Sequence, residues 1–295
     1  MTDAIIFRDY SQSQLDSQYN NRAHVPDHVE IYEVRKAEGD AALGQFQTHL
    51  DVPYGLSGEE TLDIFFPENP TQMPGGAPIN IFFHGGYWFS RHKDDFRWLA
   101  NGLAARGGIL VIVNYALIPD VDLDELVQQC RASVAWVFDN AETFGGDKNR
   151  IFVSGHSAGG HLTAMMMATD WPALSNGLPA DLIKGGTAIS GIYDLEPIRL
   201  GFMQETLGFT AEQVAAYSPV GLTPKTKAPM IVVVGGSETD EFIRQSKDFA
   251  EAWGKSLSDL QEQVPPGLNH FTVLDEFAAP ETELMKAVAK QMGLD

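Results

Sequence analysis

The segment Ile151–Leu162, with the sequence IFVSGHSAGGHL, decides the fold prediction. An apolar run typical of a buried strand ends at Ser154, and the residues from His161 to Ala168 follow a pattern typical of a helix. Between them, Gly155-His156-Ser157-Ala158-Gly159 matches G-x-S-x-G. In a sharp strand-to-helix turn the two glycines let strand and helix approach closely, and the serine projects its oxygen above the sheet. The sequence therefore predicts that Ser157 is a nucleophile at a helix N-terminus, where the helix dipole favours negative charge.

Further apolar runs lie on both sides of this segment, and helix-like patterns separate them. The runs are Ile79–Phe83, Ile109–Val113, Thr187–Ser190 and Met230–Val234. Continuous apolar strands are typical of a parallel sheet that helices cover on both faces. Apolar positions from Leu123 to Phe138 follow helical spacing, with Asp120 or Asp122 as the N-cap. The pattern predicts one α/β domain over residues 1–295, with a doubly wound, mostly parallel sheet.

Two pairs of segments lie outside this alternation. Phe46–Val52 and Leu62–Phe66 predict strands that pair antiparallel at the N-terminal edge of the sheet. The polar N-terminal segment 1–40 and the connection 191–228 are longer than the alternation requires. Because long excursions in compact domains are commonly lids or binding loops, we expect both of these segments to close over the site.

The composition excludes several classes of function. The 295 residues include 40 Asp and Glu against 20 Lys and Arg, a formal net charge of −20. A chain without a basic stretch is a poor ligand for nucleic acid or for an anionic membrane. No apolar run is long enough to span a membrane, no secretory signal is recognisable, and the single cysteine, Cys130, excludes an internal disulfide. We therefore expect a cytoplasmic protein with a small-molecule substrate as its partner, and the sequence leaves open whether it forms a homodimer.

Sequence patterns for metals and cofactors are missing as well. His24 and His28 have the spacing of helical metal ligands, but Pro26 interrupts the helix that would align them. No HExxH, no C-x-x-C, no G-x-x-x-x-G-K-[ST] and no strand-linked G-x-G-x-x-G occurs. We therefore expect neither a metal nor a cofactor.

A nucleophilic serine needs a histidine as its base, and the histidine needs an orienting carboxylate. In a fold with this nucleophile turn, the chain order is serine, acid, histidine. Of the eight histidines only His161 and His270 follow Ser157, and His161 belongs to the helix behind the nucleophile. His270, in a turn-rich loop before the strand predicted at Phe271–Leu274, is therefore the predicted base.

The acid is expected just after the strand Met230–Val234, where the sequence GGSETDE offers three carboxylates. Glu241 begins a predicted helix that ends at Trp253, and an acid in a first turn has a routine structural role. Glu238 lies closest to the tip of the strand and is favoured. Asp240 stays the alternative.

A second motif, IFFHGGYW at Ile81–Trp88, predicts the oxyanion hole. A strand that ends in His-Gly-Gly offers backbone N–H groups with no side chain in the way. Gly85 and Gly86 would supply two donors, and Ala158, directly after the nucleophile, a third. His84 is expected to brace the loop, because it precedes the nucleophile in chain order.

Together, HGGYW (84–88), GHSAGGHL (155–162), SGIYDLEPI (190–198) and EFIRQS (241–246) resemble the kynurenine formamidases, which are α/β-hydrolases close to the hormone-sensitive-lipase-like esterases. The resemblance runs from about Tyr19-Asn20-Asn21-Arg22 to the C-terminus. HGGYW is fairly specific, since the esterase relatives usually carry a third glycine in place of Tyr87. The resemblance implies an α/β-hydrolase fold and hydrolysis of N-formyl-L-kynurenine to L-kynurenine and formate. The nucleophile and base of that family correspond to Ser157 and His270 of this sequence, and the family's acid, which is usually Asp, corresponds to Glu238.

The resemblance also bears on substrate binding. Tyr87, Trp88 and Phe89 follow the oxyanion loop and would stack against an aromatic substrate ring, with packing beneath a lid as the alternative. Arg91-His92-Lys93 could meet a substrate carboxylate, although a surface role is favoured. Two other functions stay open. A carboxylesterase or an amidase for another small amide would use the same triad, whereas a non-catalytic binding protein on this scaffold would predict a damaged one.

Overall fold

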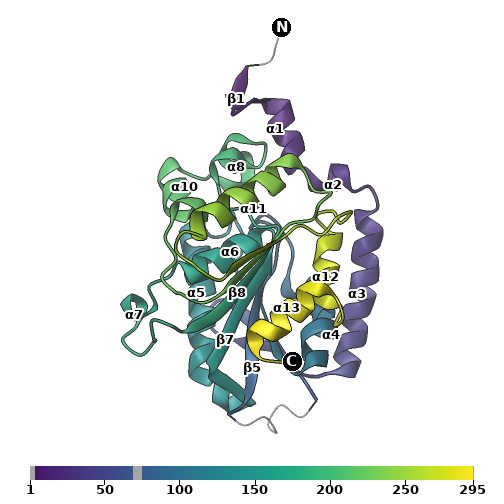
Figure 1. Cartoon of the computed structure of the whole chain (residues 1–295), viewed down its shortest axis with the longest axis vertical. Helices are drawn as coiled ribbons and strands as arrows, with labels where there is room; N and C mark the ends of the chain where they lie inside the picture. Colours follow the sequence, from purple (N-terminus) through teal and green to yellow (C-terminus); the bar gives the residue numbers. More distant parts are fainter. Residues whose placement is uncertain (1–3, 69–74, 295) are drawn as a thin grey trace.

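The centre of the molecule is an eight-stranded sheet, as Figure 1 shows. The structure is a computed structural model, and it describes residues 4–68 and 75–294. Its strands are β3 (Gln47–Pro53), β4 (Thr61–Phe66), β5 (Ala77–Phe83), β6 (Ile109–Val113), β7 (Gly146–His156), β8 (Ile183–Ile189), β9 (Met230–Val233) and β10 (Leu260–Gln263). They lie in the order β10-β9-β8-β7-β5-β6-β4-β3. All neighbours from β10 to β6 are parallel, and β4 runs antiparallel to both β6 and β3. The predicted mostly parallel sheet with antiparallel strands at its N-terminal edge is confirmed.

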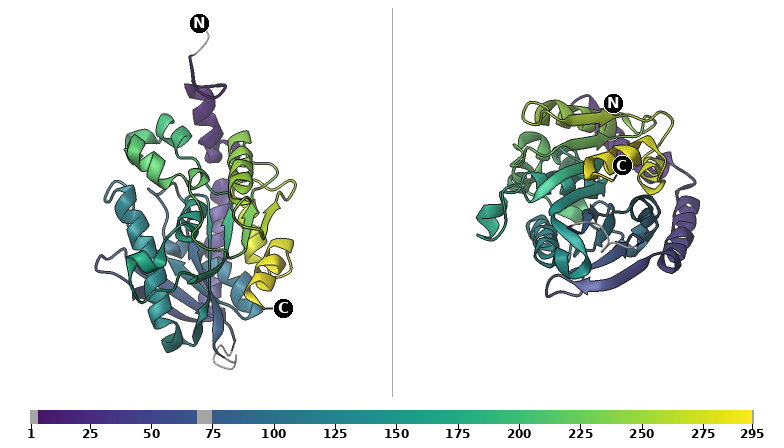
Figure 2. Two further views of the ribbon diagram at one scale, coloured as in Figure 1. Left: turned by 60° about the vertical axis from the view of Figure 1, so that its left-hand side comes forward. Right: turned by 60° about the horizontal axis from the view of Figure 1, so that its bottom comes forward.

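Side chains of the strands alternate between two hydrophobic layers, one on each face of the sheet. On β5, Ile81 and Phe83 belong to one layer and Phe82 to the other. Helices cover both layers, as Figures 1 and 2 show. The first layer is covered by α5 (Leu123–Asn140), α6 (Ala158–Met167) and α11 (Asp240–Trp253), and the second by α3 (His28–Gln45), α4 (Ala100–Leu103), α12 (Asp275–Ala278) and α13 (Glu283–Met292). No helix within residues 4–68 and 75–294 is both long and apolar enough to span a membrane.

The register of the sheet brings the motif-bearing loops together. Phe83 at the end of β5 pairs with Gly155 near the end of β7, and His156 pairs with Ile189 at the end of β8. Ile189 in turn pairs with Val233 at the end of β9. Because the carboxyl ends of parallel strands share one edge, the loops after β5, β7, β8 and β9 all begin side by side. This edge is where ligands bind in open α/β sheets.

One strand prediction is wrong, and one strand of the eight-stranded sheet has no counterpart among the predictions. Phe271–Leu274 is predicted as a strand, but Thr272–Leu274 forms a 3₁₀ turn that continues into α12. Val273, Leu274 and Phe277 are buried in the second hydrophobic layer, and their i, i+1, i+4 spacing is helical. The last strand is instead β10, whose sequence LQEQ carries no apolar run. An edge strand with one neighbour needs little apolar surface, so its pattern gives no signal.

The two segments expected to close over the site are mostly helical. The N-terminal segment contains β1 (Ile5–Phe7), β2 (Tyr10–Ser11), α1 (Gln12–Tyr19), α2 (Asn21–His24) and the start of α3, and the 191–228 connection contains α8 (Glu196–Leu200), α9 (Gln204–Leu207) and α10 (Ala211–Tyr217). A further short helix, α7 (Trp171–Leu174), lies before β8. In Figure 1 the hairpin β1–β2 and α1 extend beyond the sheet, near α8. Most of α3 runs down the right-hand side of the molecule in Figure 1, so only parts of residues 4–40 reach the carboxyl edge of the sheet.

Candidate active site

Ser157 lies at the sharp turn between β7 and α6. Its backbone angles are φ 58° and ψ −119°, a region that non-glycine residues rarely adopt, and the turn is held because the Ser157 N–H donates to the carbonyl of Ile189 at 2.9 Å. α6 begins with the next residue, Ala158. A side chain on Gly159 would stand 1.9 Å from the carbonyl oxygen of Phe83, so only glycine lets helix and strand approach this closely. The local sequence therefore fixes a strained serine at the N-terminus of a buried helix.

His270 and Glu238 form a buried pair beside this turn. Nδ1 of His270 lies 2.7 Å from Oε2 of Glu238, and the two side chains are 7% and 0% exposed. The other carboxylate oxygen, Oε1, accepts hydrogen bonds from the Ser190 hydroxyl at 2.5 Å and from the Gly235 N–H at 2.7 Å. Glu238 is thus fixed by three donors from three segments of the chain. A carboxylate held in this way can orient the imidazole and keep its proton on Nδ1.

The two alternative carboxylates contact other groups. Asp240 is exposed in the first turn of α11. Glu241 is buried, but it accepts from the Tyr19 hydroxyl at 3.0 Å and pairs with Arg244 at 2.7 Å. Of the three carboxylates after β9, the structure brings only Glu238 into contact with the histidine.

Ser157 and His270 line the same cavity, together with Gly85 and Gly86. Within the described residues the Ser157 hydroxyl has no hydrogen-bond partner. In hydrolases without bound substrate the serine–histidine contact is often longer than a hydrogen bond and shortens in the complex. The structure thus places Ser157 and the His270 of the His270–Glu238 pair in the walls of one cavity.

The glycine loop after β5 lies directly against the nucleophile. A side-chain carbon on Gly85 would stand 3.1 Å from Cβ of Ser157 and 2.8 Å from the carbonyl oxygen of His156. In the part of the chain that the structure describes, the N–H groups of Gly85, Gly86 and Ala158 donate to no protein acceptor. These three amides are therefore free to donate to a ligand, as the predicted oxyanion hole requires.

Three buried histidines support this loop and the base. His84 contacts the carbonyl of Gly85 at 2.8 Å through Nδ1 and stacks on Tyr115 with ring centroids 4.2 Å apart, which supports the expected bracing role. His156, which the sequence pattern does not single out, holds the carbonyl of His270 at 2.7 Å through Nε2. His161 holds the carbonyl of Tyr217 at 2.8 Å. Burial lowers the pKa of His84 and of His161 to about 4, and it lowers the pKa of His156 well below its usual value.

These pKa values predict a loss of stability in acid. Because the native His161 ring stays neutral down to about pH 4 while the unfolded ring protonates near 6.5, the unfolded chain binds one more proton within this window. The free energy of unfolding therefore falls as the pH falls from 6.5 towards 4. We expect wild type to lose roughly 2 kcal/mol more than His161→Gln between pH 7 and pH 5, measured by urea denaturation of both proteins. An equal loss in the two proteins would contradict the assignment.

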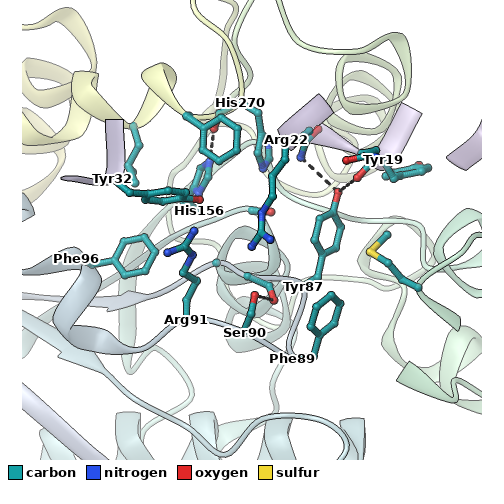
Figure 3. Close-up of a pocket in the computed structure, with 18 of the residues that line it drawn as sticks. Tyr19, Arg22, Tyr32, Tyr87, Phe89, Ser90, Arg91, Phe96, His156 and His270 are labelled. Carbon is teal, nitrogen blue, oxygen red and sulfur yellow. Dashed lines mark hydrogen bonds between the residues drawn. The ribbon is translucent and has the colours of Figure 1, made fainter. Parts of the chain in front are cut away.

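The cavity above the site has a volume of about 180 Å³, and seven Phe and Tyr residues are among those that line it. Tyr87 and Phe89 line it with nearly parallel rings 6.3 Å apart, as Figure 3 shows. Tyr87 is fixed by its hydroxyl, which donates to the carbonyl of Tyr19 at 2.7 Å, and burial raises its pKa. The prediction for Trp88 is corrected: its ring is fully buried and contacts His161 and Phe209, and it does not line the cavity. Its ring is held there because Nε1–H donates to Nδ1 of His161 at 3.3 Å.

The three residues of the cationic cluster at 91–93 have different surroundings in the structure. Lys93 is completely buried and pairs with Asp51 and Asp63 at 2.6 and 2.9 Å. His92 caps the turn that follows, because its ring accepts from the Asp94 N–H at 3.4 Å. Arg91 alone lines the cavity.

Sequence reasoning misses several cavity residues that come from distant parts of the chain. They are Tyr19, Asn20, Asn21, Arg22, Tyr32, Arg35, Phe96, Phe202, Met203 and Leu274. Arg35 of α3 donates to the carbonyl of Phe271 at 2.7 Å and pairs with Asp275 at 2.6 Å, so it anchors the loop that carries His270. A single arginine in a helix shows no local pattern that marks such a role. The Asn20-Asn21-Arg22 run enters the sequence argument only through the family resemblance.

Comparisons with known proteins agree with this geometry. The BD-FAE family model matches residues 62–177. Kynurenine formamidase of Salmo salar is 32% identical over 97% of this chain and 98% of its own length. Esterase LipC of Mycobacterium tuberculosis is 30% identical over 76% of this chain and 60% of its own length. Among solved structures, a protein described as a thioesterase from Silicibacter sp. TM1040 superimposes with a TM-score of 0.81 at 29% identity, covering 94% of this chain and 99% of that one.

Proposed function

The chain belongs to the kynurenine formamidase family, and from this premise we propose that it hydrolyses a small aryl formamide, N-formyl-L-kynurenine, to L-kynurenine and formate. It is a hydrolase, as its relatives are kynurenine formamidases and esterases. The observation that carries the proposal is that His270, which is paired with the buried Glu238, lines the same small cavity as a serine at a strained turn.

In the first half of the proposed reaction, Ser157 Oγ attacks the formyl carbon and His270 Nε2 takes its proton. Glu238 accepts from Nδ1–H and stabilises the imidazolium that forms. The negative charge that develops on the formyl oxygen is bound by the amides of Gly85, Gly86 and Ala158. One such donor typically contributes about 3 kcal/mol to lowering the barrier. His270 then gives the proton to the aniline nitrogen, the C–N bond breaks and the amine leaves.

In the second half, water attacks the formyl ester on Ser157. His270 takes a proton from the water, the oxyanion returns to the same three amides, and the ester bond breaks. The proton passes from His270 to Ser157 Oγ, and formate leaves. The enzyme is restored without any change in oxidation state.

The aromatic residues in the lining of the cavity favour a formanilide among small amides. A formyl group carries only hydrogen on its carbon, so the space beside Ser157 can be narrow. An arylamine is a better leaving group than an alkylamine, so machinery of the esterase type can cleave its amide. The parallel rings of Tyr87 and Phe89 offer an aromatic surface to the departing ring.

A carboxylesterase is the second candidate, and the similarity to Esterase LipC favours it. The two functions separate when kcat/KM is measured for N-formyl-L-kynurenine beside p-nitrophenyl acetate and p-nitrophenyl butyrate. We expect the formamide to exceed both esters by more than about tenfold, which corresponds to about 1.4 kcal/mol of transition-state binding. Esters that turn over far faster than the formamide would assign the chain to the esterases. Residual turnover by Ser157→Ala sets the background for all three substrates.

A further inference from the structure

The charge of the cavity is opposite to the charge of the chain. Asp and Glu outnumber Lys and Arg by 40 to 20 in the sequence. The lining of the cavity nevertheless includes three arginines, Arg22, Arg35 and Arg91, and no Asp or Glu among the described residues. A cleft lined by one sign of charge concentrates ligands of the other sign. This contrast points to an anionic group on the substrate.

One of the three arginines is already engaged. Arg35 is 6% exposed, and it is bound by the carbonyl of Phe271 and by Asp275. Its guanidinium also lies 4.4 Å from the centroid of the Trp98 ring. Arg35 therefore has a structural role in the cavity wall, which leaves Arg22 and Arg91 for a ligand.

Arg22 projects from a segment that is fixed on both sides. Tyr19 is bound through its hydroxyl to Glu241 and through its carbonyl to the hydroxyl of Tyr87. Asn21, beside Arg22, donates to the same Tyr87 hydroxyl at 3.3 Å. Within residues 4–68 and 75–294 the Arg22 guanidinium has no hydrogen-bond or ion-pair partner, and Figure 3 shows it extending into the cavity. The base of the side chain is anchored while its charge is left uncompensated.

Arg91 enters from the opposite wall, after the oxyanion loop. Its backbone has φ 79°, a strained value for a residue with a side chain. The guanidinium lies 3.5 Å from the centroid of the Tyr32 ring, and its ion pair with Asp95 is long, at 3.8 Å. In Figure 3 the guanidinium groups of Arg91 and Arg22 point into the cavity from facing sides. The ring of Tyr32 contacts the face of the Arg91 guanidinium, so the N–H donors at the edge of the guanidinium stay available for a ligand.

We propose that Arg22 and Arg91 together bind a carboxylate on the leaving-group side of the substrate. The proposal rests on the proposed formamidase function, because a formyl group carries only hydrogen and any anion must then lie on the amine side. Guanidinium N–H groups match a carboxylate in a bidentate geometry, and charge-assisted hydrogen bonds of this kind are strong. Since no acidic side chain among the described residues lines the cavity, an ammonium group on the substrate gains no ionic partner there. The carboxylate, and not the ammonium, is the group that this site selects.

A series of formanilides separates the two charges. The reference is N-formyl-L-kynurenine. The deamino analogue, 4-(2-formamidophenyl)-4-oxobutanoate, keeps only the carboxylate, and 3-amino-1-(2-formamidophenyl)propan-1-one keeps only the ammonium. We expect the deamino analogue to retain kcat/KM within about threefold and the ammonium-only analogue to lose at least about tenfold. Equal kcat/KM for the ammonium-only compound, or a comparable loss for the deamino compound, would overturn the proposal.

Variants then assign the effect to the two arginines. Arg22→Gln and Arg91→Gln are each expected to raise KM for the carboxylate-bearing formanilides by about 10- to 100-fold, with kcat within about threefold. KM for the neutral compound 1-(2-formamidophenyl)ethanone should change by less than about threefold in both variants. Lys247→Gln removes one positive charge from an exposed position on α11 and is the control, expected to match wild type. Equal losses on the charged and neutral compounds would show that the arginines only maintain the cavity.

A pair of esters keeps this inference separate from the formamidase proposal. The acetate esters of 3-(2-hydroxyphenyl)propanoate and of its primary amide differ only in the charge on the leaving-group side. If no formanilide is cleaved but the charged ester is preferred and loses its preference in Arg22→Gln and Arg91→Gln, the formamidase proposal fails and the carboxylate site stands. If formanilides are cleaved and neither pair of compounds shows a preference for the carboxylate, the carboxylate site fails alone.

Discussion

Replacing Ser157 by alanine is expected to lower kcat for N-formyl-L-kynurenine by roughly 10⁵- to 10⁶-fold, the loss seen when a serine nucleophile is removed from a catalytic triad. The reason is that an alanine side chain has no oxygen that could attack the formyl carbon, while the amides of Gly85, Gly86 and Ala158 stay in place. Those donors alone sustain only a small residual rate. Single-turnover assays with purified protein measure the loss directly.

The control for this variant is Ser246→Ala. Ser246 is also fully buried, and its hydroxyl has no hydrogen-bond partner in the part of the chain that the structure describes. Removing this hydroxyl should leave kcat unchanged, and both variants should unfold close to the temperature of the wild type. A Ser157→Ala protein that is folded and retains full activity would refute the proposed mechanism.

Replacing Glu238 by glutamine is expected to lower kcat by roughly 10³- to 10⁴-fold, with little change in KM. The glutamine has the same shape but only one oxygen, and its NH₂ group cannot accept a hydrogen bond. Oε1 of Glu238 accepts from Ser190 and Gly235, whereas Oε2 faces His270. With the amide oxygen on the side of Ser190 and Gly235, the NH₂ group faces His270 Nδ1. The ring then carries its proton on Nε2, so it cannot take the proton of Ser157.

Asp240→Asn is the matched control for the acid. It makes the same change from carboxylate to amide two residues away, at an exposed position in the first turn of α11. Its expected cost is about 0.5 kcal/mol of stability, from a weaker interaction with the helix dipole, and kcat should stay within about twofold. If kcat falls in Asp240→Asn and not in Glu238→Gln, the acid must be reassigned to Asp240.

Much of the frame that carries the site could be predicted from the sequence. The strand–turn–helix around Ser157 and the glycine loop after β5 depend on residues within a few positions of each other. The local sequence is therefore enough to predict both. The choice of His270 follows from chain order in this fold, which leaves one histidine. The sequence narrows the N-cap of α5 to two residues, and Asp122 is the one whose side chain accepts from the Glu125 N–H.

The predictions that fail or stay open involve contacts between distant segments. The strand predicted at Phe271–Leu274 is a helical turn, because its apolar residues face a layer built by α4, α12 and α13. Trp88 has cavity residues on both sides in the sequence, but its own ring is buried against His161, a contact between segments 73 residues apart. β10 could not be detected, because a polar edge strand is defined by its neighbour β9 and not by its own residues.

By itself, the sequence determined the elements that carry the site and the order in which they occur along the chain. Only the tertiary structure decided which of Glu238 and Asp240 contacts His270, and which aromatic and basic side chains enter the cavity. The physical reason is the distance along the chain. A turn or a strand is set by neighbours in the chain, whereas the direction of Glu238 depends on Ser190, 48 residues away, and the surroundings of Arg91 include Tyr32 of α3. Contacts of this kind exist only once the sheet has brought its loops to one edge.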